Sequence, residues 1–303
     1  MKSLKSRFEI EKEKFLRECV LCGACQKNCP IFPYSSYRDQ DPIGLQQMKI
    51  DFLKEGTLKG EVYDMAYTCT LCESCGELCP AGLDPCLLTE IIRAELANCG
   101  KKAPEIIKIA LPHEEKNMFD LLTSAQITPS QVPWITEVPY APKNTETVLF
   151  TGCLGRCLPH ITLTTVDIFA KMGLNFITLA GGKYCCSDTT MVDGNPEGSE
   201  KLARELIDAV EAFQPERVVF CCLDCNFRLE KIFPFIPHSA QFQYLVPFLA
   251  ENLENLKFIQ PQKKKVTLHD PCHLRRGLGD YDSPRKLLSA IPGVELVEMP
   301  HSR

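Results

Sequence analysis

Apolar residues in the first part of the chain recur at intervals of three and four, which is the period of an amphipathic helix. One helix is predicted at the N-terminus, a second over 43–55 with a C-cap at Gly56, and a third from Pro85 to Gly100. Residues 1–127 are therefore predicted to form a mostly helical domain.

The pattern changes after residue 146, where short apolar runs alternate with helical segments. The runs predict buried strands at 147–153, 175–180 and 216–222, and helices are predicted between them at about 161–172 and 197–213. Such alternation is typical of a parallel sheet in an α/β domain. Cysteines end the first and third runs, and ligands of these sheets bind beyond the carboxyl ends of the strands.

Composition narrows the class of protein. The 303 residues are 45% hydrophobic and 24% charged with a net charge of −5, which is ordinary for a globular protein and gives no sign of nucleic-acid binding. No apolar run approaches the roughly 20 residues of a membrane helix, and the N-terminus lacks the apolar segment of a secretory signal. The 18 cysteines therefore favour metal binding over disulfides.

The pattern C-x2-C-x2-C-x3-C-P occurs twice, and the two copies are offset by 50 residues. Three closely spaced thiolates suit one [4Fe–4S] cluster, and the fourth, beside proline, ligates the other cluster. The predicted ligands of the first cluster are Cys19, Cys22, Cys25 and Cys79; those of the second are Cys69, Cys72, Cys75 and Cys29. Two zinc sites are the alternative, but zinc favours paired C-x2-C knuckles. Cys86 and Cys99 lie outside the motif and are predicted to be small core residues.

A third group of cysteines follows in the α/β part. Its members are Cys153, Cys185, Cys186, Cys222 and Cys225. Adjacent cysteines on a regular strand point to opposite faces, so the pair is predicted to lie in a loop at Gly181–Gly182. Five thiolates exceed the need of one cubane or one zinc ion and suit an irregular cluster. A zinc site with spare thiols and a [2Fe–2S] site stay open as alternatives.

A longer repeat links this part to the end of the chain. The run VLFTGC ending at Cys153 matches VTLHDPC ending at Cys272. The counterpart of the cysteine pair would fall near 305–306, beyond Arg303. We therefore expect residues 263–303 to be the start of a second, incomplete repeat, in which Cys272 is a further candidate iron ligand.

Two ferredoxin motifs followed by cysteine-rich repeats resemble the fused catalytic subunit of heterodisulfide reductases. The five-cysteine pattern, known as CCG, is also similar to that in iron–sulfur subunits of anaerobic glycerol-3-phosphate dehydrogenase, glycolate oxidase and lactate-utilisation enzymes. The resemblance covers nearly the whole chain and implies a noncubane [4Fe–4S] cluster on the five cysteines. Ser187 differs from the family pattern, which has a glycine at this position. Glycine allows close backbone approach or an unusual φ, and serine tolerates either less well.

The expected fold is α+β and multidomain. A helical ferredoxin-like domain with two [4Fe–4S] clusters (1–127) precedes a linker with four prolines (128–146). The first cysteine-rich α/β repeat (147–262) and the incomplete second repeat (263–303) follow.

The expected function is that of an iron–sulfur electron-transfer subunit in an anaerobic oxidoreductase complex. It would relay electrons between a flavoprotein partner and a further acceptor. The sequence has no P-loop and no G-x-G-x-x-G after a strand, so FAD is expected on the partner. Disulfide reduction at the five-cysteine cluster is the second hypothesis, and a non-redox scaffold with structural metal is the third. We expect a cytoplasmic location, with membrane contact only through a partner.

Overall fold

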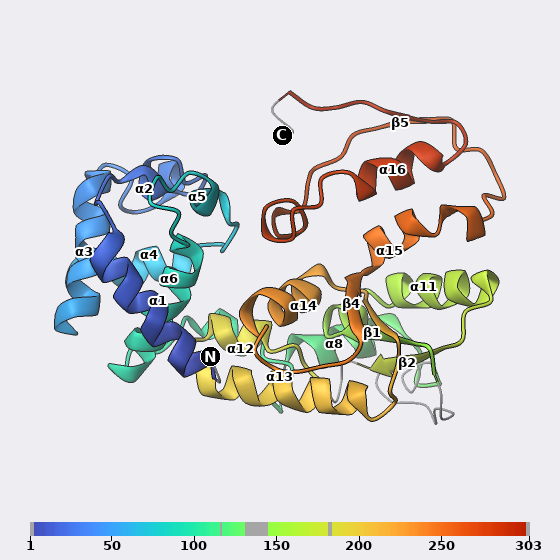
Figure 1. Ribbon diagram of the computed structural model, residues 1–303, viewed down its shortest axis with the longest axis horizontal. Coiled ribbons are helices and arrows are strands. Elements are labelled where there is room, and N and C mark those ends of the chain that lie inside the picture. The colour runs from blue at the N-terminus through green and yellow to red at the C-terminus, as the bar shows by residue number, and fades with distance from the viewer. Residues whose placement is uncertain (1–2, 116, 131–144, 181–183, 301–303) are drawn as a thin grey trace. The chain divides into compact units, whose positions relative to one another are not determined.

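The computed structural model describes residues 3–115, 117–130, 145–180 and 184–300 (Figure 1). Contacts between residues divide the chain into two units. Unit 1 comprises residues 1–111 and 187–201, and unit 2 comprises the remainder.

The regular secondary structure of unit 1 is helical throughout its described residues, and loops join the helices. Its helices are α1 (Leu4–Glu18), α2 (Ala24–Lys27), α3 (Pro42–Glu55), α4 (Val62–Thr68), α5 (Ser74–Glu77), α6 (Pro85–Asn98), α7 (Glu105–Lys108) and α12 (Asp188–Val192), with a 3-10 turn η1 at Phe32–Tyr34. Helix α6 is buried along most of its length and packs against α1, α3 and α4. It forms the centre of the helical core on which the cysteine loops rest.

Side-chain caps fix where the long helices of unit 1 begin. Asp41 accepts a hydrogen bond from the Gly44 amide at the start of α3, and Gly56 ends this helix in the left-handed conformation. Asp84 caps α6 in the same way. The three helices predicted from the apolar pattern are therefore confirmed to within a few residues.

Unit 2 contains a parallel sheet flanked by helices. Its elements are α8 (Met118–Gln126), β1 (Thr147–Gly152), α10 (Leu154–Cys157), α11 (Pro159–Met172), β2 (Phe176–Ala180), β3 (Arg217–Phe220), α14 (Leu223–Phe227), a π-helical turn η2 (Arg228–Ile232), β4 (Gln241–Tyr244), α15 (Leu245–Glu251) and a 3-10 turn η3 (Leu253–Asn255). Helix α13 (Pro196–Glu211) begins in unit 1 and ends in unit 2.

The strands of the large sheet lie in the order β2-β1-β3-β4, and every pair is parallel. Val148 of the central strand β1 pairs with Ile177 on one side and with Val218 on the other. All six residues of β1 are buried, as expected for a strand covered on both faces. The three predicted strands and the helices between them are confirmed, and β4 is a fourth strand that the apolar pattern did not predict.

The end of the chain repeats the strand–helix–strand order. Strand β5 (Lys264–Val266) leads into a π-helical turn η4 (His273–Gly277) and helix α16 (Ser283–Ala290), and β6 (Val294–Leu296) then pairs with β5 in parallel. Both strands are largely exposed. This arrangement agrees with the predicted second repeat.

Some sequence predictions fall where the structure gives no description. Gly181 and Gly182 and residues 131–144 of the linker lie outside the described residues, whereas Cys185 and Cys186 are described and lie in a loop, as predicted. Among the helices that are described, none has the length and apolar character needed to cross a membrane.

Candidate iron–sulfur sites

The first group of cysteines surrounds a small pocket in unit 1. The loop between α1 and α2 carries Cys19 and Cys22, α2 carries Cys25, and Cys79 comes from the second motif. All four thiols line this pocket together with Phe15 and Gln46. The structure thus brings the fourth cysteine of one motif to the first three of the other.

A buried glutamine holds two of these thiols. The Cys25 thiol donates to Oε1 of Gln46 at 3.3 Å, and the Gln46 Nε2 donates to the Cys19 sulfur at 3.7 Å. Gln46 comes from α3 and is 2% exposed. Burial raises the pKa of the Cys25 thiol to about 11, so metal binding there must displace a proton. Sequence reasoning missed Gln46, because no motif contains it.

The second group repeats the backbone of the first. Leu21 and Leu71 have φ values of 54° and 52°, and Gly23 and Glu73 have 69° and 63°. These pairs are 50 residues apart, so both loops use left-handed residues at the same places. Backbone amides in such loops form concave nests that favour negatively charged groups, including iron–sulfur clusters.

Cys29 lies with the cysteines of the second motif. Burial raises the pKa of its thiol, and the nearby thiols of Cys69 and Cys72 raise it further. Arg93 of α6 fixes the backbone at the start of this loop: its Nε donates to the Ala66 carbonyl at 2.9 Å and its Nη2 to the Cys69 carbonyl at 2.8 Å. Cys29 therefore lies near Cys69 and Cys72 of the other motif.

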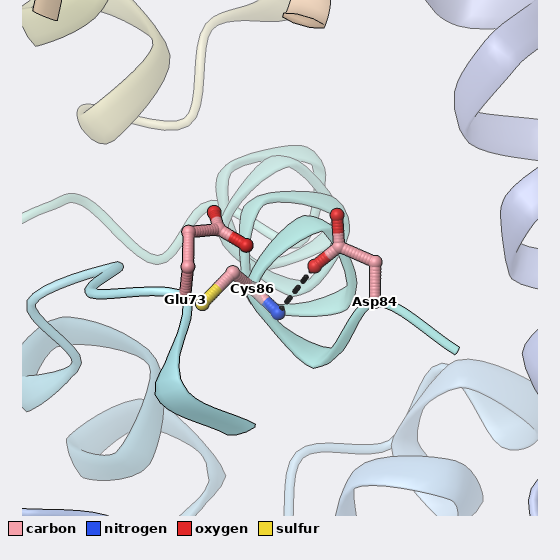
Figure 2. Close-up of side chains that lie close together, drawn as sticks. All are labelled: Glu73, Asp84 and Cys86. Carbon is pink, nitrogen blue, oxygen red and sulfur yellow. Dashed lines mark hydrogen bonds between the residues drawn. The ribbon is translucent and has the colours of Figure 1, made fainter. Parts of the chain in front are cut away.

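Cys86 also lies in the second group, although it is outside the motif. Its sulfur is 3.7 Å from that of Cys75. Its hydrogen bond lowers the pKa of the Cys69 thiol to about 5, and the same contacts raise the pKa of Cys86. Figure 2 shows Cys86 at the start of α6 with Glu73 and Asp84 beside it. Cys86 is buried as predicted, but Cys99 is exposed, so its prediction as a core residue is wrong.

The third group gathers where the strands of the large sheet end. Cys153 follows β1 directly, Cys222 lies two residues after β3, and Cys225 lies in α14. The Cys225 thiol is within hydrogen-bonding reach of Cys186 and Cys222, and these contacts and its complete burial raise its pKa well above the ordinary value. Cys185, the residue before Cys186, is also buried, whereas Cys153 is half-buried.

Glycine at position 152 lets the chain approach these thiols closely. Its φ is +65°, and a Cβ there would lie 3.1 Å from the Cys225 sulfur. Because Gly152 has no side chain, the end of β1 leaves room beside the Cys225 sulfur. Such room is expected at a site that holds a ligand.

The start of the second repeat is attached to α14, next to this group. The His273 ring stacks on Phe227 at 4.1 Å between centroids, and its Nδ1 lies 2.6 Å from Oδ1 of Asp224. This hydrogen bond lowers the pKa of Asp224. The Arg276 Nη2 donates to the Cys272 sulfur at 3.1 Å. Cys272 thus lies in the segment that packs on the helix carrying Cys225.

Ser187 has the conformation that its place in the motif implies. Its φ is +74°, in the left-handed region. The side chain is fully buried, and its Oγ is 2.8 Å from Oγ of Ser199. The chain therefore tolerates serine here through a buried hydrogen bond.

All three groups offer soft thiol donors, which is the donor set that iron–sulfur clusters require. The first is arranged around a pocket, the second brings Cys75 within 3.7 Å of Cys86, and the third places Cys225 in contact with Cys186 and Cys222. The residues present therefore fit iron–sulfur clusters.

Two known domain families match this chain. Residues 15–83 match the family described as 4Fe-4S dicluster domain, and residues 147–230 and 266–303 match the family described as cysteine-rich domain. No solved structure matches the chain.

Several curated proteins are similar over nearly the whole chain. One of the subunits of the CoB–CoM heterodisulfide reductase of Methanosarcina barkeri is 28% identical over 95% of this chain and 76% of its own length. One of the subunits of the fumarate reductase (CoM/CoB) of Methanothermobacter marburgensis is 27% identical, over 96% of this chain and 58% of its own length. The EtfAB:quinone oxidoreductase of Syntrophomonas wolfei is 23% identical, over 92% and 45%. The chain therefore combines a 4Fe-4S dicluster domain with a following cysteine-rich domain, and over nearly its whole length it is similar to subunits of heterodisulfide reductase and related oxidoreductases.

Proposed function

We propose that this chain is the electron-transfer subunit of an anaerobic oxidoreductase complex. Its relatives are named as subunits of a heterodisulfide reductase and of a fumarate reductase, and as an EtfAB:quinone oxidoreductase. Because these reactions differ, the similarity supports a shared role in electron transfer more than a shared substrate. The electrons would pass between a flavoprotein partner that carries FAD and a further acceptor. A membrane-bound partner could supply an anchor.

The proposal assigns the cysteines to three clusters. Cys19, Cys22, Cys25 and Cys79 would hold the first [4Fe–4S] cluster, and Cys69, Cys72, Cys75 and Cys29 the second. Cys153, Cys185, Cys186, Cys222 and Cys225 would hold a third, noncubane [4Fe–4S] cluster, with Cys272 as a further candidate ligand. The observation that carries the assignment is the pocket of unit 1, where Cys79 faces three cysteines of the other motif.

The chain's own residues would hold and tune these groups. Iron–sulfur clusters, when bound, accept and release single electrons over a wide range of potentials. The Gln46 amide would donate to the Cys19 sulfur, and Arg93 would keep the second loop in place through two backbone carbonyls. The third group is the best protected, because Cys185, Cys186, Cys222 and Cys225 are buried, and this burial would limit the access of water and oxygen there.

Single substitutions of the exchanged cysteines test this function. In protein purified without oxygen, we expect iron and acid-labile sulfide at about four atoms of each per cluster. Cys79→Ser should weaken the first cluster and Cys29→Ser the second, as measured by iron content and electron paramagnetic resonance (EPR). Cys99→Ser, an exposed cysteine outside all three groups, is the control. Zinc without sulfide, or folded protein without iron, would refute the proposal.

Disulfide reduction is a second candidate, and the similarity to the heterodisulfide reductase of Methanosarcina barkeri favours it. The reaction takes two electrons and two protons, breaks the S–S bond and releases two thiols. We would mix the dithionite-reduced protein with the CoB–CoM heterodisulfide and measure thiol formation and cluster reoxidation. Turnover by this chain alone would establish catalysis, and intact clusters without turnover would leave electron transfer as the function.

A further inference from the structure

We propose that Cys86 donates a hydrogen bond to the ligand sulfurs of the second cluster and raises its reduction potential. This inference rests on the proposed function, because it takes Cys69, Cys72, Cys75 and Cys29 as the ligands. It assigns a tuning role to a thiol that the ferredoxin motif does not include.

The position of Cys86 supports the proposal. Its sulfur lies 3.7 Å from that of Cys75 and within hydrogen-bonding reach of Cys69. The side chain is 3% exposed, so water does not compete freely for its proton. A buried thiol in contact with two ligand sulfurs is well placed to act on both.

The start of α6 keeps Cys86 in this place. Oδ1 of Asp84 accepts the backbone amides of Cys86 and Leu87, each at 3.0 Å, and Figure 2 shows the first of these bonds. Asp84 is thereby used as a helix cap. The Glu73 carboxylate lies within 4.8 Å of both the Asp84 carboxylate and the Cys86 sulfur.

The chemistry of the ligands decides the direction of the hydrogen bond. Thiols that bind iron lose their protons and can only accept. Cys86 is outside the set of four, so its S–H group is the donor in its contact with the Cys75 sulfur. Hydrogen bonds to cluster sulfurs are one of the means by which proteins set the potential, since they stabilise the added negative charge of the reduced cluster.

The first cluster has a different residue at the matching place. The position 50 residues before Cys86 is Ser36, whose Oγ donates to Asp64 at 3.2 Å on the exposed surface. The effect of Cys86 should therefore be confined to the second cluster, which makes the first cluster an internal reference.

Redox titration of intact protein, followed by EPR, tests the role of Cys86. Cys86→Ala should shift one cluster to a more negative potential and leave the other unchanged. Cys86→Ser keeps a donor and should restore most of the wild-type potential. Cys99→Ala removes an exposed thiol at the other end of α6 and should change neither potential. A purely structural role of Cys86 would not distinguish serine from alanine in this way.

Two results would overturn the inference. One is an unchanged potential in Cys86→Ala with its full iron content. The other is loss of about four irons from folded Cys86→Ala, which would make Cys86 a ligand. Failure of the proposed function looks different, because wild-type protein would then lack the clusters before any substitution is made.

Discussion

Individual backbone conformations explain why certain small residues stand beside the cysteines. Gly23 has φ +69°, and a Cβ there would lie 3.1 Å from the backbone of Pro42 and Ile43 at the start of α3. Left-handed φ alone costs an ordinary residue about 1–2 kcal/mol. At Gly23 the close backbone contact adds to this cost.

A pair of glycine substitutions separates the two costs. Gly56 has the same φ of +69°, but nothing lies within 4 Å of its missing Cβ. Gly56→Ala should therefore lower the free energy of unfolding by about 1 kcal/mol. Gly23→Ala should lower it further and displace the first cysteine loop. The midpoint of urea unfolding under anaerobic conditions, read from loss of cluster absorbance, measures both, and equal effects would contradict the steric argument.

At Ser187, the sequence predicted part of the local structure but not the contact that stabilises it. The family's glycine there allows either close backbone approach or an unusual φ, and the structure shows the second, with φ +74° at Ser187. The compensating contact with Ser199 could not be read from the sequence, because the two residues meet only when α12 and α13 are folded. The same holds for Gln46 and Cys86, whose partners come from other elements.

At the scale of elements, apolar patterns predicted the long helices and the buried strands because burial on defined faces leaves a period in the sequence. Strand β4 (QFQY) escaped prediction because only Phe242 is buried and its neighbours are polar. The π-helical turn at His273–Gly277 also escaped, since it is specified by contacts with α14. Cysteine spacing predicted that Cys79 lies with the first three cysteines of the other motif, but not the side chains that surround them.

One arginine joins the elements of the second repeat. Arg285 of α16 makes a two-point ion pair with Asp270, at 2.7 and 2.9 Å, and also binds Glu298 after β6. Asp270 lies two residues before Cys272, and both partners of the pair are largely buried. Arg285 therefore fixes the loop that presents Cys272.

Removal of this arginine should loosen the second repeat. Arg285→Leu leaves the Asp270 carboxylate buried without its partner, which costs about 3–5 kcal/mol in comparable sites. We expect faster hydrogen exchange over 264–298. Lys265→Ala is the control, because Lys265 pairs with Glu295 on the surface and such pairs contribute about 0–1 kcal/mol. Equal protection in the two variants would show that Arg285 does not hold the loop.

On the scale of the whole chain, the cysteine loops of unit 1 differ from the sheet of unit 2 in what stabilises them. The sheet of unit 2 has a core of fully buried strand residues, such as Val148, Leu149 and Val219. In unit 1, the cysteine loops contain helices of only four residues, α2 and α5, which are too short to be stable without other contacts. The exchanged cysteines would join these loops to each other through the clusters.

Removal of iron should therefore affect the units unequally. Metal binding contributes directly to folding where ligands come from segments that are otherwise weakly held. We expect chelation to raise hydrogen exchange strongly over 19–30 and 69–80, because each loop then loses its connection to the other motif. Exchange over β1 should stay slow, since its six residues are buried by apolar contacts on both faces. Mass spectrometry of the iron-loaded and chelated protein measures both regions in one sample. Cysteine loops that keep their protection without iron would show that protein contacts alone hold them, and the clusters would then have no structural role in unit 1.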